Sequence, residues 1–174
     1  MSRTQYYVAS SLDGFIADQE ETLDWLLSRD TGDAEGAPGY DEFIAATGAL
    51  AMGSRTYEWV LEHEDGRWPY DLPCWVFTSR ELEPRPGVTF TSDDVATVHR
   101  AMVEAAGGRN VWLVGGGELV GRFTDAWLLD EIVLALVPVT LGAGYPLLPR
   151  RVELKLEESS RAGELLMTRF SVVR

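Results

Sequence analysis

The sequence is poor in the residues that build disulfides and metal sites. It contains one cysteine, Cys74, one lysine, Lys155, and two histidines, His63 and His99, which are far apart in the chain. A single cysteine excludes an internal disulfide and a cysteine metal cluster, and the two histidines lack the spacing of a ligand pair. We therefore expect neither a metal centre nor a disulfide framework.

Long apolar runs and an excess of positive charge are also missing. No apolar segment approaches the length that crosses a bilayer, and we expect no secretory signal. The formal net charge of −13 opposes binding to nucleic acid or to an anionic membrane, because a protein that binds either of them needs a basic surface. The expected partner is a small molecule, and the expected location is the cytoplasm. A few arginines can still form a local site for an anionic cofactor.

The alternation of strands and helices predicts one α/β domain over residues 1–174. Its length and its 45% hydrophobic content suit a single core. Apolar patterning predicts strands at 5–10, 15–17, 49–52, 74–78, 88–91, 111–114, 132–137, 152–160 and 165–173. Helices are expected at 23–27, 40–47, 55–61, 120–129 and from an Asp93 or Asp94 cap to residue 106, with a loop at 30–39. This order predicts a mostly parallel central sheet with helices on both faces and an antiparallel C-terminal strand.

Three consecutive glycines are the main landmark of the sequence. The buried-type strand 111–114 is followed by Gly115, Gly116 and Gly117, and then by apolar residues at helical spacing: Leu119, Val120, Phe123, Trp127 and Leu128. We expect these glycines to form a sharp turn outside the core. A helix that begins at such a turn presents unpaired N–H groups, which suit a phosphate. The spacing is neither that of a dinucleotide fingerprint nor that of a P-loop, so a tight turn without a ligand remains the alternative.

Residues that suit an extended anionic ligand follow three of the predicted strands. The segments are 53–56, 78–80 and 115–118, and two of them contain an arginine, Arg55 or Arg80. The carboxyl ends of parallel strands lie along one edge of a sheet, where ligands bind. Arginines would supply charge, and Ser54, Thr56 and Ser79 hydrogen bonds. The alternative is a helix cap at residue 56 and a solvated turn at 79–80.

A set of short motifs, spread over nearly the whole chain, resembles a known family. The motifs are Met52-Gly53-Ser54-Arg55-Thr56, Ser79-Arg80 and Val114-Gly115-Gly116-Gly117-Glu118-Leu119, followed by Phe123, Leu129-Asp130-Glu131 and Pro138. Together they resemble the dihydrofolate reductase fold, a three-layer α/β architecture. The segment Ser11-Leu12-Asp13-Gly14-Phe15-Ile16-Ala17 resembles the branch that includes the RibD C-terminal domain, the reductase domain of bacterial riboflavin biosynthesis.

The resemblance implies that the protein binds NADPH. The matching positions for the pyrophosphate are Gly53, Ser54, Arg55, Thr56 and the block Val114, Gly115, Gly116, Gly117, Glu118 and Leu119. Ser79 and Arg80 would bind the 2′-phosphate, while Ala9 and Ile16 would line the nicotinamide pocket. The family also implies a cis peptide bond between Gly115 and Gly116, where glycine makes this bond least costly.

The substrate side departs from the family pattern. Folate reductases carry a threonine where this chain has Ala135, and the riboflavin enzymes carry a lysine at the position of Tyr7 and an acid where Val60 and Leu61 fall. The catalytic candidates are Asp13, which is otherwise a turn residue, and Asp41, which is otherwise a helix-capping acid. Trp25 and Tyr40 could stack on a flat heterocycle or belong to the core.

These observations predict an NADPH-dependent reductase that transfers a hydride to a small heteroaromatic substrate, the nearest named activity being riboflavin-pathway reduction. The alternative is a non-catalytic nucleotide-binding protein that retains the fold. A homodimer is a further hypothesis, with an interface built from the apolar strand 132–137 and the strands that follow it.

Overall fold

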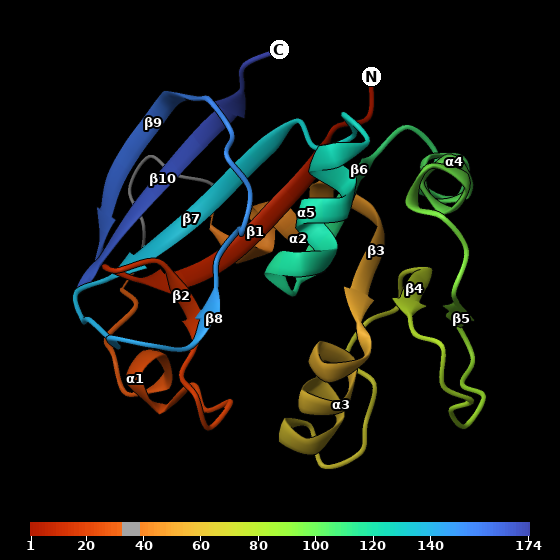
Figure 1. Ribbon diagram of the computed structural model, residues 1–174, viewed down its shortest axis with the longest axis horizontal. Coiled ribbons are helices and arrows are strands. Elements are labelled where there is room, and N and C mark those ends of the chain that lie inside the picture. The colour runs from red at the N-terminus through yellow and green to blue at the C-terminus, as the bar shows by residue number, and fades with distance from the viewer. Residues whose placement is uncertain (33–38) are drawn as a thin grey trace.

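A central eight-stranded sheet organises the chain. The computed structural model describes residues 1–32 and 39–174, so most of the loop expected at 30–39 lies outside the described residues. The sheet has the order β5-β4-β3-β6-β1-β7-β10-β9, and a separate pair joins β2 to β8 (Figure 1). The strands are β1 Thr4–Ser11, β2 Phe15–Ala17, β3 Thr47–Gly53, β4 Cys74–Phe77, β5 Val88–Thr91, β6 Asn110–Gly115, β7 Glu131–Val137, β8 Tyr145–Pro146, β9 Leu154–Ala162 and β10 Leu165–Val172.

The pairing confirms a mostly parallel sheet with antiparallel strands at its C-terminal edge. The strands from β5 to β7 pair in parallel, whereas β10 runs antiparallel to both β7 and β9. Parallel neighbours need long crossover connections. The β3–β4 connection contains α3, and the β4–β5 connection is a loop, whereas β9 and β10 are joined by a tight turn at Gly163. The helices are α1 Asp24–Leu27, α2 Tyr40–Ala46, α3 Ser54–His63, α4 Val95–Ala106 and α5 Gly117–Asp125.

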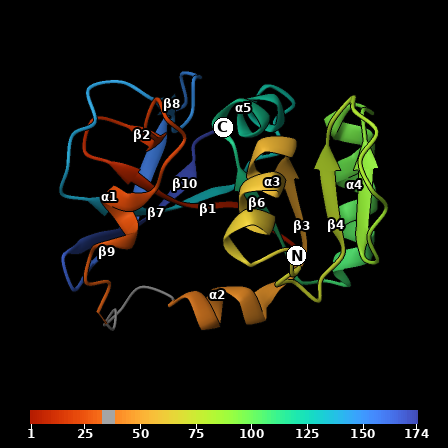
Figure 2. The same cartoon turned by 90° about the horizontal axis from the view of Figure 1, so that it is seen from below.

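Helices cover both faces of the sheet, as the sequence predicts. Ala49 and Ala51 of β3 face the core under α4 and α5, whereas Leu50 and Met52 face the core shared with α2 and α3. Figure 2 shows α5 and α2 on opposite sides of β1 and β6. This alternation follows from the two-residue period of a strand. Residues 49–52 of β3 are apolar at successive positions because both faces of the strand are buried.

Two helix ends show how local chemistry sets the bounds. Asp94, not Asp93, caps α4 by accepting a hydrogen bond from the backbone N–H of Thr97 at 3.0 Å. The last predicted turn of α5 is wrong, because the helix stops at Asp125. Trp127 then takes a left-handed φ of 59° and is 69% exposed. The N–H of Leu128 donates to the carbonyl of Phe123, so that a tryptophan holds the position in this C-terminal cap that glycine usually takes.

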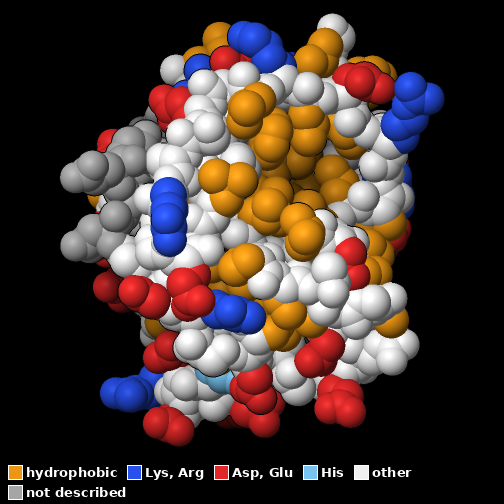
Figure 3. Space-filling view, turned by 90° about the vertical axis from the view of Figure 1, so that its left-hand side faces the viewer, with side chains coloured by type: hydrophobic (Ala, Val, Ile, Leu, Met, Phe, Trp, Pro, Cys, Tyr) orange, Lys and Arg blue, Asp and Glu red, His pale blue; other side chains and the backbone are white. Residues whose placement is uncertain are grey.

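The sheet face over β7, β10 and β9 is apolar and largely open. We define the β9–β10 apolar face by side chains that the strand register places on one side: Leu136, Leu154, Leu156, Leu166 and Phe170. Leu154, Leu156 and Leu166 are 39%, 54% and 44% exposed. Figure 3 shows apolar side chains gathered in a shallow hollow on this side of the molecule. A patch of this kind is typical of a contact surface.

None of the helices in the described part of the chain has the length and apolar character needed to span a bilayer.

Candidate functional site

The three predicted loops leave adjacent strands at the same edge of the sheet. In the sheet order, β3 lies between β4 and β6, and all three are parallel. Gly53 pairs with Phe77, and Met52 pairs with Gly115, so the carboxyl ends of these strands are level. Segments more than sixty residues apart in sequence therefore meet at one edge, as the sequence predicts.

The N-termini of α3 and α5 meet at this edge, and we call their meeting point the glycine corner, formed by Gly53, Thr56, Gly115 and Gly116. A Cβ atom placed on Gly53 would lie 4.0 Å from the backbone nitrogen of Gly116, and one placed on Gly115 would lie 3.5 Å from Thr56 Oγ1. Ile16 closes one side, with Cδ1 3.9 Å from a Cβ placed on Gly116. The Gly115–Gly116 peptide bond is cis, as the resemblance implied.

Neither helix at the glycine corner has a side-chain cap. The N-cap residues are Gly53 for α3 and Gly116 for α5, and neither helix receives a capping hydrogen bond from a side chain. The first N–H groups of a helix have no partner within it, and its dipole places partial positive charge at this end. Two such ends side by side therefore favour an anion with two charged groups.

Gly117, the third glycine, is held against the backbone of β8. A Cβ atom at this position would lie 2.2 Å from the carbonyl oxygen of Pro146 and 2.6 Å from that of Leu147. Gly115 and Gly117 are buried, so the expectation that the three glycines lie outside the core is wrong for these two. The strand β8 was not expected within the loop 138–149, because two residues carry no detectable pattern.

Arg55 lies in α3 and Arg80 contacts it, and both arginines are paired with acids. Arg55 donates to Glu21 Oε1 at 2.9 Å and to the hydroxyl of Tyr145 at 2.7 Å. Arg80 donates to Glu58 Oε1, one turn after Arg55 on α3, at 2.9 Å. This hydrogen bond raises the pKa of the Arg80 guanidinium. These side chains are exposed and can therefore change partners when an anion arrives.

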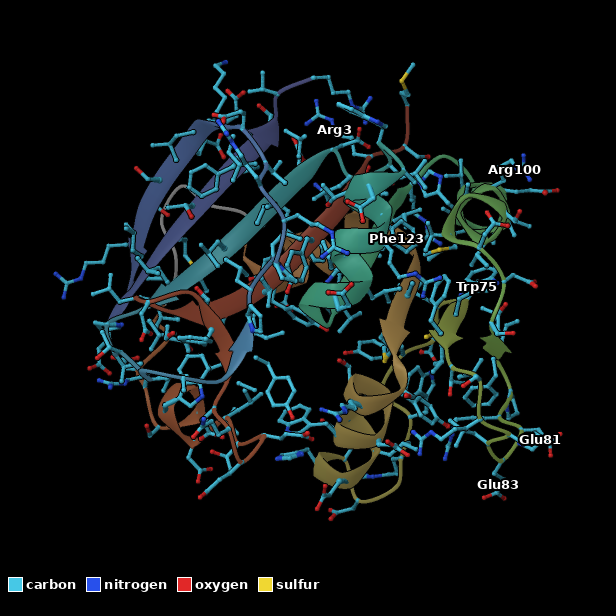
Figure 4. All side chains as sticks on the ribbon, in the orientation of Figure 1. Arg3, Trp75, Glu81, Glu83, Arg100 and Phe123 are labelled. Atoms are coloured by element: carbon cyan, nitrogen blue, oxygen red, sulfur yellow. The ribbon has the colours of Figure 1, made fainter. Side chains whose placement is uncertain are left out.

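The segment of Ser79 and Arg80 opens an exposed loop after β4. Ser79 is exposed, and the backbone N–H of Arg80 donates to Thr78 Oγ1 at 3.1 Å. Glu81 and Glu83 project outward from this loop, away from the sheet (Figure 4). The loop thus keeps these two carboxylates at its outer edge, where they lie in solvent.

Asp13, the first catalytic candidate, joins two loops at the carboxyl end of β1. Its carboxylate accepts hydrogen bonds from the Ser11 hydroxyl at 2.6 Å and from the backbone N–H groups of Leu141 and Gly142 at 3.0 and 2.7 Å. These bonds, with Ser11 first, lower its pKa to about 2. An acid that stays ionised near neutral pH is a poor proton donor, so this geometry favours a bracing role.

Asp41, the second candidate, is exposed in the first turn of α2. It is not the helix cap, because Gly39 occupies that position. The helix packs on the sheet through Phe43, whose ring centroid lies 4.4 Å from that of Tyr7. Tyr40 lies 6.1 Å from Trp112 by the same measure, so it belongs to an aromatic cluster while remaining 46% exposed. The cluster leaves one side of Tyr40 open to solvent.

Two of the substituted family positions, Tyr7 and Ala135, share one face of the sheet. Ala9 pairs with Ala135 across β1 and β7, and Trp25 packs into the same apolar cluster. Burial, and secondarily the neighbouring Tyr40, raises the pKa of the Tyr7 hydroxyl, which therefore stays protonated. This face offers aromatic and apolar surface and a neutral hydroxyl where the related enzymes have charged or hydroxyl-bearing side chains.

The other residues of the glycine block contribute backbone rather than side chains. Glu118 is bound by Arg150 at 2.8 Å, Leu119 is buried in the core under α5, and Val114 packs on the opposite core. The amide groups at the start of α5 remain available to a ligand. Sequence reasoning missed Glu21 and Tyr145, which stand in an acidic segment and a glycine-rich loop without periodic pattern.

Two surface hollows lie at opposite ends of the strands. One of about 510 Å³ adjoins the β2–β8 pair and is lined by Phe15, Gln19, Gly142, Ala143, Gly144 and Tyr145. A larger one of about 610 Å³ lies at the opposite end of the sheet, where Arg3 and Arg169 both bind the buried carboxylate of Glu131. Because those arginines already share a buried acid, the glycine corner is the better anion site.

The sheet order, the helices on both faces and the cis glycine pair define a dihydrofolate reductase-like α/β protein. The chain belongs to the RibD C-terminal domain family, whose model matches residues 4–167. It is 34% identical over 173 residues to the uncharacterized protein YwjB of Bacillus subtilis (strain 168), covering 97% of each chain.

Solved structures agree with this fold. The crystal structure of a protein named "Putative riboflavin biosynthesis protein" from Shewanella sp. PV-4 superposes with a TM-score of 0.83 at 27% identity, covering 99% of each chain. The diaminohydroxyphosphoribosylaminopyrimidine deaminase/5-amino-6-(5-phosphoribosylamino)uracil reductase of Thermotoga maritima gives 0.65 at 15% identity. It is matched over 99% of the present chain and 57% of its own. At that identity the likeness concerns the fold.

Proposed function

We propose that this protein binds NADPH at the glycine corner and uses it to reduce a small heteroaromatic molecule. The observation that carries the proposal is the meeting of two uncapped helix N-termini, with Gly53 and Gly116 about one side chain apart. The diphosphate would bind there, because its two charges match two positive helix ends. Arg55 would add a charged hydrogen bond.

The remaining contacts follow the edge of the sheet in both directions. Ser79 and Arg80, after β4, are proposed to bind the 2′-phosphate, while Ile16 and Ala9 are proposed to line the nicotinamide pocket. When bound, NADPH supplies the hydride. The chain itself orients the reactants and excludes water, and Asp13 fixes the loops that border the pocket through the N–H groups of Leu141 and Gly142.

The substrate proposal rests on the family and on the aromatic face beside α2. The name of the Thermotoga maritima protein includes 5-amino-6-(5-phosphoribosylamino)uracil reductase, and its fold is shared. Tyr40 and Trp25 would offer flat surface to a heteroaromatic ring. Tyr7 and Ala135 replace the polar side chains expected there, which argues for a substrate other than folate or the ribose phosphate of the riboflavin pathway.

A non-catalytic nucleotide-binding protein is the second candidate, and the same substitutions favour it. With Asp41 exposed and the Asp13 carboxylate ionised, no proton donor has been identified among the predicted acids. In that case the glycine corner would bind the nucleotide, and the aromatic face would carry no reaction. Turnover, measured separately from binding, decides between the two candidates.

The test uses a variant that fills the glycine corner. In Gly53→Val the new Cβ would lie 4.0 Å from the backbone nitrogen of Gly116, an ordinary contact distance, so the fold should persist. The added side chain would then occupy the space in which we expect the diphosphate to bind. Gly39→Val is the matched control, because a Cβ there meets no atom of residues 1–32 or 39–174 within 4 Å. We expect NADPH to shift the melting temperature and the cofactor fluorescence for wild type and control only. Equal responses in all three proteins, or none in wild type, would refute the proposal.

Turnover is tested by NADPH consumption with a panel of pteridines, aminouracils and quinones. Consumption with any of them, lost in Gly53→Val, supports the reductase. Binding without consumption across the panel supports the non-catalytic alternative.

We also propose that the β9–β10 apolar face binds a second copy of this chain. Among its paired positions the only ionisable side chain is Arg161, opposite Leu166, although the chain as a whole carries a net charge of −13. Two copies repel each other least where the surface is uncharged and apolar, and an isologous interface needs a single such patch.

A further inference from the structure

Arg55 links α3 to two segments that are distant from it in the sequence. It lies in the first turn of α3, and its guanidinium reaches Glu21, after β2, and Tyr145, in β8. It also lies 5.3 Å from the centre of the Tyr145 ring. The Tyr145 hydroxyl donates in turn to Glu21 Oε1 at 2.6 Å. Three side chains from three separate segments thus form a closed triangle of hydrogen bonds, which we call the Arg55 triangle.

The turn that carries Glu21 is fixed by an acid of its own. The Asp18 carboxylate accepts hydrogen bonds from the backbone N–H groups of Glu20 and Thr22 at 3.0 and 2.8 Å, and the N–H of Glu21 donates to the Asp18 carbonyl at 3.1 Å. Glu21 has a left-handed φ of 61°, an uncommon conformation for a residue other than glycine. The backbone of Glu21 is therefore held in place by its neighbours, which sets the point from which its side chain reaches Arg55.

We infer that Glu21 is an internal competitor for the anionic ligand and that Tyr145 positions Arg55. Resting on the proposed function, this inference deepens it by naming what controls the affinity of the site. The Glu21 carboxylate occupies Nη1 of the Arg55 guanidinium, so an anion that bonds to this nitrogen must replace Glu21, and an anion bound to the other guanidinium nitrogens meets the Glu21 negative charge beside it. The ring of Tyr145 can stay beside Arg55 during this exchange, because a cation–ring contact does not depend on Glu21.

The exchange has a consequence for selectivity. A singly charged anion offers Arg55 about what Glu21 already offers, whereas a diphosphate also gains the two helix ends of the glycine corner. Glu21 therefore discriminates against weakly charged ligands. Because the side chains of Arg55 and Glu21 are 67% and 49% exposed, the competing pair is weak and reversible. Removing the Glu21 carboxylate should tighten anion binding by about two- to fivefold.

The experiment compares wild type, Glu21→Gln and Glu20→Gln in the full chain. Glu20 is the neighbouring exposed acid, so its variant makes the same change in net charge next to the same turn. Dissociation constants for NADPH and for inorganic diphosphate are measured by calorimetry at low and at high salt. We expect Glu21→Gln to bind both probes about two- to fivefold more tightly than Glu20→Gln at low salt, with a smaller gain at high salt.

Each result separates this inference from the proposed function. Equal or weaker binding by Glu21→Gln, compared with Glu20→Gln, would show that Glu21 does not compete for Arg55. If no protein binds NADPH, the proposed function fails, and diphosphate still tests the competition. Tyr145→Phe keeps the ring and removes the hydroxyl, so we expect it to change diphosphate affinity less than Tyr145→Ala. Equal losses in both variants would overturn the positioning role of the ring.

Discussion

Gly117 lies so close to Pro146 that a single added carbon would collide with backbone. A Cβ on Gly117 would stand 2.2 Å from the Pro146 carbonyl oxygen. This contact seats the first turn of α5 on β8, and β8 in turn carries Tyr145 of the Arg55 triangle. Gly117 thus fixes the distance between the N-terminus of α5 and β8, the strand whose Tyr145 contacts Arg55.

Replacing Gly117 with alanine should destabilise the protein. Neither colliding partner is a flexible side-chain end, so α5 or β8 must shift, and overpacking of this kind costs about 1–3 kcal/mol. Urea unfolding should show a large loss of unfolding free energy for Gly117→Ala and a small change for Gly39→Ala, whose Cβ meets no atom of the described residues within 4 Å. Equal stability of the two variants would contradict the contact.

The Asp13 carboxylate should contribute stability that depends on pH. Its pKa falls from an ordinary 3.8 to about 2 in the folded protein, mainly through the Ser11 hydroxyl. A lowered folded-state pKa gives stability that is fully present above pH 4 and is lost as the pH falls toward 2. We expect Asp13→Asn to be less stable than wild type at pH 7, with the difference shrinking between about pH 4 and pH 2.

Unfolding curves at pH 7, 4 and 2 measure this effect. Asp71→Asn, a change at another exposed acid, serves as the control and should leave the pH profile of stability close to that of wild type. A difference between Asp13→Asn and wild type that stays constant over this range would show that the loop bonds do not depend on the ionised carboxylate.

Arg80→Ala should lower the affinity for NADPH more than that for NADH. If Arg80 binds the 2′-phosphate, its removal takes away a hydrogen bond between charged groups, worth roughly tenfold or more in affinity. NADH lacks that phosphate and should bind equally well to variant and wild type. Arg67→Ala makes the same change in charge on another exposed loop and should leave the ratio of the two affinities unchanged. Parallel losses for both cofactors would argue against the assigned role.

Leu156→Glu should convert a dimer to a monomer. The side chain lies on the β9–β10 apolar face and is 54% exposed, so a carboxylate there would lose its water against the apolar surface of the partner. Sedimentation velocity at micromolar concentration measures the change, with Leu27→Glu, which is 60% exposed outside that face, as the control. A wild-type protein that sediments only as a monomer would end the dimer proposal.

The strand and helix order could be predicted from the sequence, because periodicity and turn residues act locally. β3 is apolar at successive positions since both of its faces are buried, and Asp94 caps α4 through a bond three residues away. The sequence also predicts that the segments at 53–56 and 115–118 lie at the same edge of the sheet. Both segments follow parallel strands, and the carboxyl ends of parallel strands share one edge. The end of α5 did not follow, because Trp127 takes a backbone conformation that its residue type rarely adopts.

The sequence by itself determined the class of fold and the edge of the sheet that carries Arg55, Arg80 and the glycine corner. Only the tertiary structure decided what those arginines touch, since Glu21 is 34 residues and Tyr145 is 90 residues from Arg55 in the chain. It likewise decided that Asp13 braces a loop 128 residues away and that Gly117 is buried. The physical reason is range: propensity and periodicity reach a few residues, whereas ion pairs and backbone contacts depend on which strands the folded sheet makes neighbours.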